Sequence, residues 1–187
     1  MKTIKIYLAG SIKKGSSDNH KKFYWTDREK QEIRDVFQGF EVVFLDPHIR
    51  GDKVDDPLSV MGRDFCQVTV CDFVFVDARE RRGLGVGMEM AVAKMHGVPV
   101  VAIAPRNSHY RRDEITYVGQ TVKDFVHSNV WGCSDAVVET PREAAEWARA
   151  HLENPKPVKG PEFVREAIEH YKRTNLHRDG LMKKVLE

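Results

Sequence analysis

The sequence has little of what secreted and membrane proteins are built from. Its 187 residues include only three cysteines, Cys66, Cys71 and Cys133, with no Cys-x-x-Cys spacing. This pattern indicates neither a disulfide framework nor a zinc site. No apolar run approaches the roughly 20 residues of a membrane-spanning helix, and the N-terminus opens on a strand pattern instead of a signal peptide. We therefore predict a cytoplasmic protein with reduced thiols and no membrane partner.

An excess of charge of one sign is also missing. The 30 basic and 28 acidic side chains leave a net charge of +2, which gives no attraction toward nucleic acid. There is no Gly-x-x-x-x-Gly-Lys loop, so hydrolysis of nucleoside triphosphates is disfavoured. Acidic residues crowd positions 46–56 without a regular ligand spacing, and we predict no metal site.

What is present is a regular alternation of strand and helix patterns. The predicted strands are residues 3–9, 40–45, 73–76, 98–103 and 136–138. The predicted helices are residues 20–37, 58–70, 84–96, 114–125 and 141–152. Such an alternation is typical of an α/β domain with an open parallel five-stranded sheet and helices on both faces. We assign this domain to residues 1–153, and residues 154–187 to a proline-rich linker and a C-terminal helical extension. The extension is too short to be a domain, and we expect it to pack on the body or on a neighbouring subunit.

The most informative segment follows the buried strand pattern at residues 73–77. Gly83, Gly85 and Gly87 predict a turn that opens a helix and lets a ligand approach bare backbone N–H groups. Glu89 lies in the first turns of that helix, where the helix dipole is expected to favour its ionised form. An ionised carboxylate in a crevice is what nucleophilic attack on an anomeric carbon requires.

Other candidate residues meet at the same place. In open α/β sheets, ligands bind beyond the carboxyl ends of the strands. Gly10 and Ser11 follow the first strand, and Asp46 follows the second. Tyr7 is expected on the floor of the crevice, and Asp64 projects toward it from the preceding helix.

Tyr7, Asp64 and Glu89 together suggest a division of labour. One carboxylate attacks, a second handles the leaving group, and the phenol holds the nucleophile. Each residue also has a structural interpretation: Tyr7 as a core aromatic, Asp64 as a partner of Arg63, and Glu89 as a surface carboxylate at a helix start.

These residues carry a family resemblance. The segments 6–12, 71–76, 83–90 and 97–101, together with Asp64, resemble the nucleoside 2-deoxyribosyltransferase family and its branch of 2′-deoxynucleoside 5′-phosphate N-hydrolases. The resemblance implies a flavodoxin-like or Rossmann-like sheet and cleavage of the N-glycosidic bond of a deoxynucleoside or its monophosphate. It makes Glu89 the nucleophile, Tyr7 the phenol that orients it, and Asp64 the carboxylate at the sugar or the departing base. No metal or organic cofactor is implied.

The resemblance also implies that a neighbouring subunit completes each site, in a homodimer or larger assembly. Residues 127–129 are the candidate segment. The predicted substrate-binding residues are Gly10, Ser11, Ile12, Asp46, Gly83, Gly85, Gly87, His127, Ser128 and Asn129.

The chain departs from the family at Gly83. The transferases usually carry Asp in this place, six residues before the nucleophile, and the hydrolase branch carries Ser. The substrate therefore cannot be copied from either branch, although Lys13, Arg81, Arg82 and His127 could surround a phosphate.

Two alternatives remain open. One is a phosphoribohydrolase of the cytokinin-activating type, whose typical Pro-Gly-Gly-x-Gly-Thr motif is absent here. The other is a nucleotide-binding module without turnover.

Overall fold

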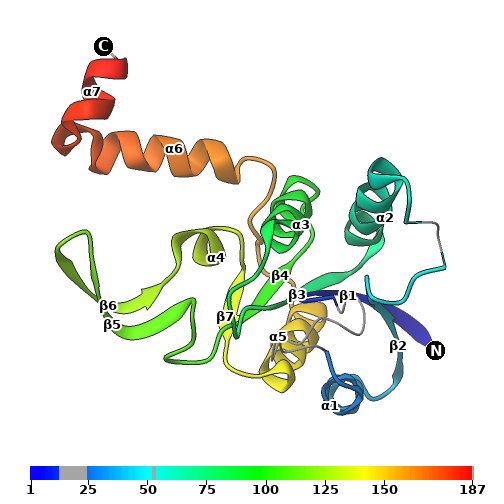
Figure 1. Ribbon diagram of the computed structural model, residues 1–187. Coiled ribbons are helices and arrows are strands. Elements are labelled where there is room, and N and C mark those ends of the chain that lie inside the picture. Colours follow the sequence, from blue (N-terminus) through cyan, green and yellow to red (C-terminus); the bar gives the residue numbers. More distant parts are fainter. Residues whose placement is uncertain (13–24, 52–53, 187) are drawn as a thin grey trace, which may run out of the picture.

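A five-stranded parallel sheet forms the centre of the computed structural model, which describes residues 1–12, 25–51 and 54–186 (Figure 1). The strands lie in the order β2-β1-β3-β4-β7, with every neighbouring pair parallel. This is the strand order of flavodoxin-like folds, so the predicted fold class is confirmed. The strands are β1 (Lys2–Ala9), β2 (Phe40–Leu45), β3 (Phe73–Asp77), β4 (Val100–Ile103) and β7 (Ala136–Val138).

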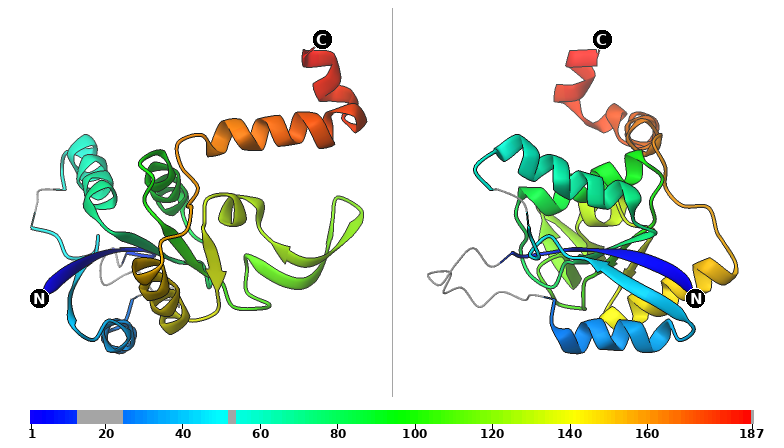
Figure 2. Two further views of the ribbon diagram at one scale, coloured as in Figure 1. Left: turned by 180° about the vertical axis from the view of Figure 1, so that it is seen from behind. Right: turned by 90° about the vertical axis from the view of Figure 1, so that its right-hand side faces the viewer.

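Helices cover both faces of this sheet (Figures 1 and 2). On one face lie α1 (Asp27–Val36) and α5 (Pro141–Glu153), and on the other lie α2 (Pro57–Val70), α3 (Leu84–Met95) and α4 (Ser128–Gly132). Because side chains alternate along a strand, β1 contributes to two separate cores. Its residues Ile4, Ile6 and Leu8 pack with the α1 and α5 side, whereas Tyr7 and Ala9 pack with the α2 and α3 side.

Capping residues fix where several helices begin. Helix α1 begins after Thr26, whose side chain and that of Glu29 form a capping box. The predicted helix from residue 20 therefore begins at Asp27, and its predicted start lies outside the described residues. Thr140 caps α5 and Pro141 occupies its first turn, as the sequence predicts.

The predicted helix at residues 114–125 is wrong. The chain forms an antiparallel hairpin there, β5 (Arg111–Tyr117) and β6 (Gln120–Val126). Val118 and Gly119 make the two-residue turn, with φ of 48° and 74°. Tight hairpin turns of this kind require positive φ at both central residues, and the strand-forming residues around Gly119 provide the pairing on either side. The hairpin projects from the body beside α4 (Figure 1).

The C-terminal extension forms α6 (Phe163–Thr174), the 3₁₀ helix η1 (Leu176–Arg178) and α7 (Gly180–Leu186). These helices project away from the sheet in both views of Figure 2, and none of their described residues is buried. The domain boundary at residue 153 stays a prediction, and so does the packing of this extension on a neighbouring subunit. Among the described helices, none is both long enough and apolar enough to cross a membrane.

A buried ion pair ties the linker before α6 to the body. Lys94, at the end of α3, is fully buried and pairs with Asp135. The Asp135 carboxylate also accepts hydrogen bonds from the backbone N–H of Val100 at 2.7 Å and of Lys159 at 2.8 Å. The Lys159 ammonium lies over the Trp131 ring, 4.3 Å from its centroid. One carboxylate therefore joins α3, β4 and the linker.

Candidate active site

The strand order places the candidate site at the carboxyl ends of β1 and β3. From β1 the chain passes to β2 on one side, and from β2 it crosses back through α2 to β3 on the other side. The connections that follow β1 and β3 consequently diverge, which creates the crevice in which open α/β sheets bind ligands. Ala9 pairs with Val76 in the sheet, so the residues after both strands begin side by side.

Tyr7, Asp64 and Glu89 come together on the α2 and α3 side of the sheet, although they are far apart in the sequence. Tyr7 on β1 is fully buried, and Glu89 on α3 is 7% exposed. Burial raises the pKa of the Tyr7 phenol, and the neighbouring Glu89 and Asp64 carboxylates raise it further. Those two interactions place both acids beside the phenol, as the predicted division of labour requires.

The ionisation of Glu89 differs from the prediction. Burial raises its pKa from 4.5 to about 7, with the Tyr7 hydroxyl opposing the rise and Asp64 adding to it. The helix dipole does not dominate, because α3 begins at Leu84 and Glu89 lies beyond its first turn. Desolvation outweighs the helix dipole, so the pKa of Glu89 lies close to neutral pH, as it does for many catalytic acids and bases.

The polar ends of this pair lack hydrogen-bond partners that meet strict geometry. The Tyr7 hydroxyl and Glu89 Oε2 are buried, and neither makes a hydrogen bond to the described residues. A hydrogen-bond interaction between the two groups raises the pKa of Tyr7 and opposes the rise in the pKa of Glu89, so the hydroxyl and the carboxylate face each other, although their geometry is too loose for a full hydrogen bond. Buried polar atoms cost free energy unless they are hydrogen-bonded, so this pair is suited to bond with a bound molecule.

Two arginines orient Asp64. Its Oδ1 lies 3.0 Å from Arg50 Nη1 and 3.5 Å from Arg63 Nη1. Arg63 also donates to the carbonyl of Ile49 at 2.7 Å. The structural interpretation of Asp64 as a partner of Arg63 is therefore correct, and it coexists with proximity to Glu89.

The glycine turn borders open space. Cβ atoms built at Gly83 and Gly87 would meet no other described atom within 4 Å, and one at Gly85 would meet only Glu89 Oε1 at 3.9 Å. None of the three has positive φ, so the turn does not need glycine for its backbone conformation. The missing side chains instead leave room for close approach by another molecule.

A cavity of about 430 Å³ lies beside the first half of α3. Its apolar lining includes Val86, Met88 and Met90, and its rim includes Tyr110. Four predicted binding residues line it, namely Gly83, Gly87, His127 and Asn129. Tyr7, Asp64 and Glu89 are not among its lining residues.

The other predicted substrate-binding residues lie in different environments. Ser11 accepts a hydrogen bond from Arg82 at 2.6 Å, and a Cβ at Gly10 would lie 3.2 Å from the Trp25 indole nitrogen. Both oxygens of Asp46 are engaged, one by Lys30 at 2.7 Å and one by the backbone N–H of His48 at 2.9 Å. Asp46 thus already has local partners. Ile12 is half-buried, and Ser128 is exposed.

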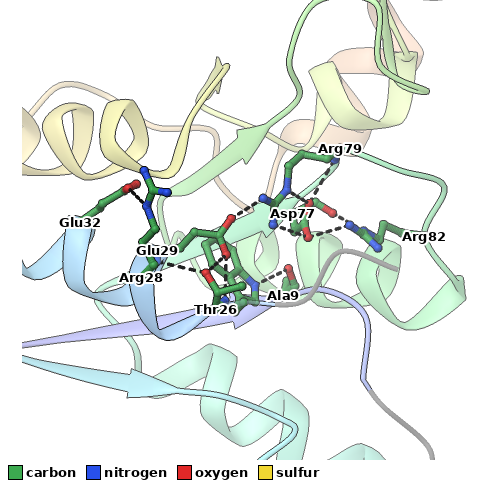
Figure 3. A network of polar contacts seen from close by, with 9 residues as sticks. Ala9, Thr26, Arg28, Glu29, Glu32, Asp77, Arg79 and Arg82 are labelled. Atoms are coloured by element: carbon green, nitrogen blue, oxygen red, sulfur yellow. Dashed lines mark hydrogen bonds and ion pairs between the residues drawn. The ribbon is translucent and has the colours of Figure 1, made fainter. Parts of the chain in front are cut away.

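The sequence reasoning missed a buried polar network at this edge of the sheet. Asp77 ends β3, and both Arg79 and Arg82 bind its side chain (Figure 3). The available signal was an acid directly after four apolar residues, followed by arginines two and five positions later. Tyr110 had no such signal. In the part of the chain that the structure describes, no three His, Cys, Asp or Glu side chains group as metal ligands.

Comparison with known proteins supports the fold. No protein-family model and no curated protein sequence matches the chain. Among solved structures, a 2-desoxiribosyltransferase from Leishmania mexicana aligns over 82% of this chain and 99% of its own, with a TM-score of 0.53 and 15% identity. A 2-deoxyribosyltransferase from Bacillus psychrosaccharolyticus aligns over 83% and 98%, with a TM-score of 0.50 and 16% identity. At these identities the likeness establishes a shared fold.

Proposed function

We propose that this protein breaks the N-glycosidic bond of (deoxy)nucleosides or their 5′-monophosphates, with Glu89 forming a covalent glycosyl-enzyme intermediate. The observation that carries the proposal is the convergence of a buried Glu89 with Tyr7 and Asp64 at the carboxyl edge of the sheet. The fold shared with two 2-deoxyribosyltransferases supports the same conclusion. The chain would then belong to the nucleoside 2-deoxyribosyltransferase family, as a transferase or an N-hydrolase.

In the first step, ionised Glu89 attacks the anomeric carbon. A bond from Glu89 to this carbon forms while the carbon–nitrogen bond breaks, and the base leaves with the electron pair and takes up a proton. Asp64, held by Arg50 and Arg63, is the proposed carboxylate at the sugar or the departing base, and the proton on the base comes from solvent. The Tyr7 hydroxyl donates a hydrogen bond that orients Glu89. In the second step, water or another base attacks the anomeric carbon and frees Glu89. Water makes the protein a hydrolase, and a base makes it a transferase.

Base release tests this proposal. The wild type and Glu89→Gln are incubated with a panel of nucleosides and their 5′-monophosphates, with and without an added base, and products are separated by chromatography. We expect release by the wild type and a loss of about 10³-fold or more in the variant, because the nucleophile is gone. Glu146→Gln, in the exposed Arg142–Glu146 pair, is the control.

Two outcomes bear on the alternatives. Release restricted to ribonucleotides, with ribose 5-phosphate as the co-product, would favour a phosphoribohydrolase. Calorimetric binding of nucleotides without any release would favour a binding module and contradict the catalytic proposal.

We also infer that the protein is a homodimer or a larger assembly. Helix α3 carries only two charged side chains, Glu89 and Lys94, and both are buried. Its outward residues are apolar, including Leu84 (91% exposed) and Met95 (60% exposed). Exposed apolar surface of this kind, continuous with the rim of the cavity, is typical of a protein interface.

Light scattering tests this inference. We expect the wild type to be at least dimeric at micromolar concentration and Met88→Glu to shift toward the monomer, because a charge would be buried in the interface. Met61→Glu changes a similarly exposed methionine on α2 and should leave the assembly unchanged. A monomeric wild type would contradict the inference.

A further inference from the structure

The polar network at the carboxyl edge is centred on a buried carboxylate. The side chain of Asp77 is 1% exposed, and it lies between Arg79 Nε at 2.9 Å and Arg82 Nη2 at 2.7 Å (Figure 3). Arg79 also pairs with Glu29, the capping-box residue of α1. Buried charges persist only when they are paired and hydrogen-bonded, so these groups fix one another in place.

Arg82 links three segments that are distant in sequence. Its Nη1 donates to Ser11 Oγ at 2.6 Å after β1, and its Nε donates to the carbonyl of Asp77 at the end of β3. Its backbone N–H donates to the Tyr110 hydroxyl at 2.9 Å, at the base of the hairpin. All these contacts converge one residue before Gly83, the N-cap of α3.

The first turn of α3, which follows Arg82, gains few side-chain contacts from its glycines, and Val86 is the one residue of 83–87 that is buried in the core. Gly83 provides no side-chain cap, and Gly83 and Gly87 have no described neighbour within 4 Å of a Cβ position. Glycine also loses the most conformational freedom on ordering. The start of α3 is therefore held by the burial of Val86 and by the polar contacts of Arg82.

We propose that Arg82, with Asp77 as its counter-charge, is the positioning residue of the site: it holds the glycine turn against Ser11 and thereby sets the position of Glu89 on α3. This proposal rests on the proposed function. Asp77 offsets the charge of Arg82, so the proposed role of Arg82 is geometric, and direct ligand contact from its place in the cavity lining is the alternative that KM decides. A displacement of about 1 Å in a reacting group can lower turnover about 100-fold.

Arg82→Lys separates geometry from charge. Lysine retains the positive charge beside Asp77 but lacks the planar fork that reaches Ser11 and the Asp77 carbonyl together. We expect kcat to fall about 10- to 100-fold, KM to stay within about twofold, and the thermal midpoint to change little. Arg142→Lys, in an exposed ion pair on α5, is the matched control.

A double-mutant cycle tests whether Arg82 acts through Ser11. If it does, Ser11→Ala added to Arg82→Lys will lower kcat much less than it does in the wild type, because the contact is already lost. Amide hydrogen exchange of residues 87–90, the first amides of α3 with intrahelical acceptors, provides a readout that needs no turnover, and we expect faster exchange in Arg82→Lys.

The outcomes are distinct. Unchanged exchange at residues 87–90 would overturn the positioning role, and so would a raised KM with normal kcat, which would indicate direct ligand binding. Additive effects in the cycle would also overturn it. If the wild type releases no base, the proposed function fails, and hydrogen exchange alone then decides the role of Arg82.

Discussion

At pH 8, the Glu89→Gln variant is expected to be more stable than the wild type by about 3 kcal/mol. Burial raises the pKa of Glu89 from 4.5 to about 7, and every tenfold weakening of an acid corresponds to about 1.4 kcal/mol. Glutamine is similar in shape and carries no charge, so it avoids the cost of burying an ionised carboxylate.

Proton linkage determines the sign of this stability difference. Between pH 4.5 and 7, unfolded Glu89 has lost its proton while folded Glu89 keeps it, so the wild type loses stability as pH rises through this range. Below pH 4.5 the residue is protonated in both states, and above pH 7 it is ionised in both. The advantage of glutamine should therefore be small at pH 4 and nearly complete at pH 8.

Urea unfolding at pH 4, 6 and 8 measures this advantage. Glu146→Gln on exposed α5 should show no comparable gain at any of these values. A Glu89→Gln variant that is equally or less stable at pH 8 would mean that Glu89 is ionised at little cost, as the helix dipole alone predicted. The same variant should be inactive, so stability and turnover would change in opposite directions.

Asp135→Asn is expected to lower the free energy of unfolding by about 3–5 kcal/mol near pH 6, because it leaves the buried Lys94 ammonium without a counter-charge. Burial already lowers the pKa of Lys94, and loss of Asp135 should lower it further. A neutral folded lysine binds fewer protons than the unfolded one, so stability then rises with pH. The defect should be smaller at pH 9 than at pH 6.

Adding Lys94→Met to Asp135→Asn should recover most of the loss, since a neutral apolar chain replaces the stranded charge. Asp113→Asn, in the exposed pair with Arg106, should leave the unfolding midpoint nearly unchanged. A double variant as unstable as Asp135→Asn alone would mean that the Asp135 hydrogen bonds to Val100 and Lys159 matter more than the ion pair.

The sheet was predictable because its signals are local. Apolar runs such as residues 73–76 and 100–103 become strands buried on both faces, and no distant information is needed to recognise them. The hairpin was not predictable in the same way. Residues 111–126 are rich in charge and pair only with one another, so the decisive features are the positive φ of Val118 and Gly119.

The candidate site, too, was predictable only in its local features. The glycine turn and the residue types of Tyr7, Asp64 and Glu89 were visible in the sequence. The raised pKa of Glu89 was not, because desolvation depends on packing among β1, α2 and α3. The role of Arg82 was also hidden, since its partners Ser11 and Tyr110 lie 71 and 28 residues away.

The base of the hairpin has a consequence for how this protein can diversify. The backbone N–H of His127 donates to the carbonyl of Tyr110 at 2.8 Å, so the chain leaves and re-enters the body at one point. Because its two ends meet, the hairpin connects β4 and β7 as a short loop would. The entropy cost of closing a loop grows only slowly with the length of the loop. Insertions and deletions between these two residues can therefore accumulate during evolution without changing the sheet. Variation would concentrate on the surface beside the cavity, while the contact of Tyr110 with Arg82 stays fixed.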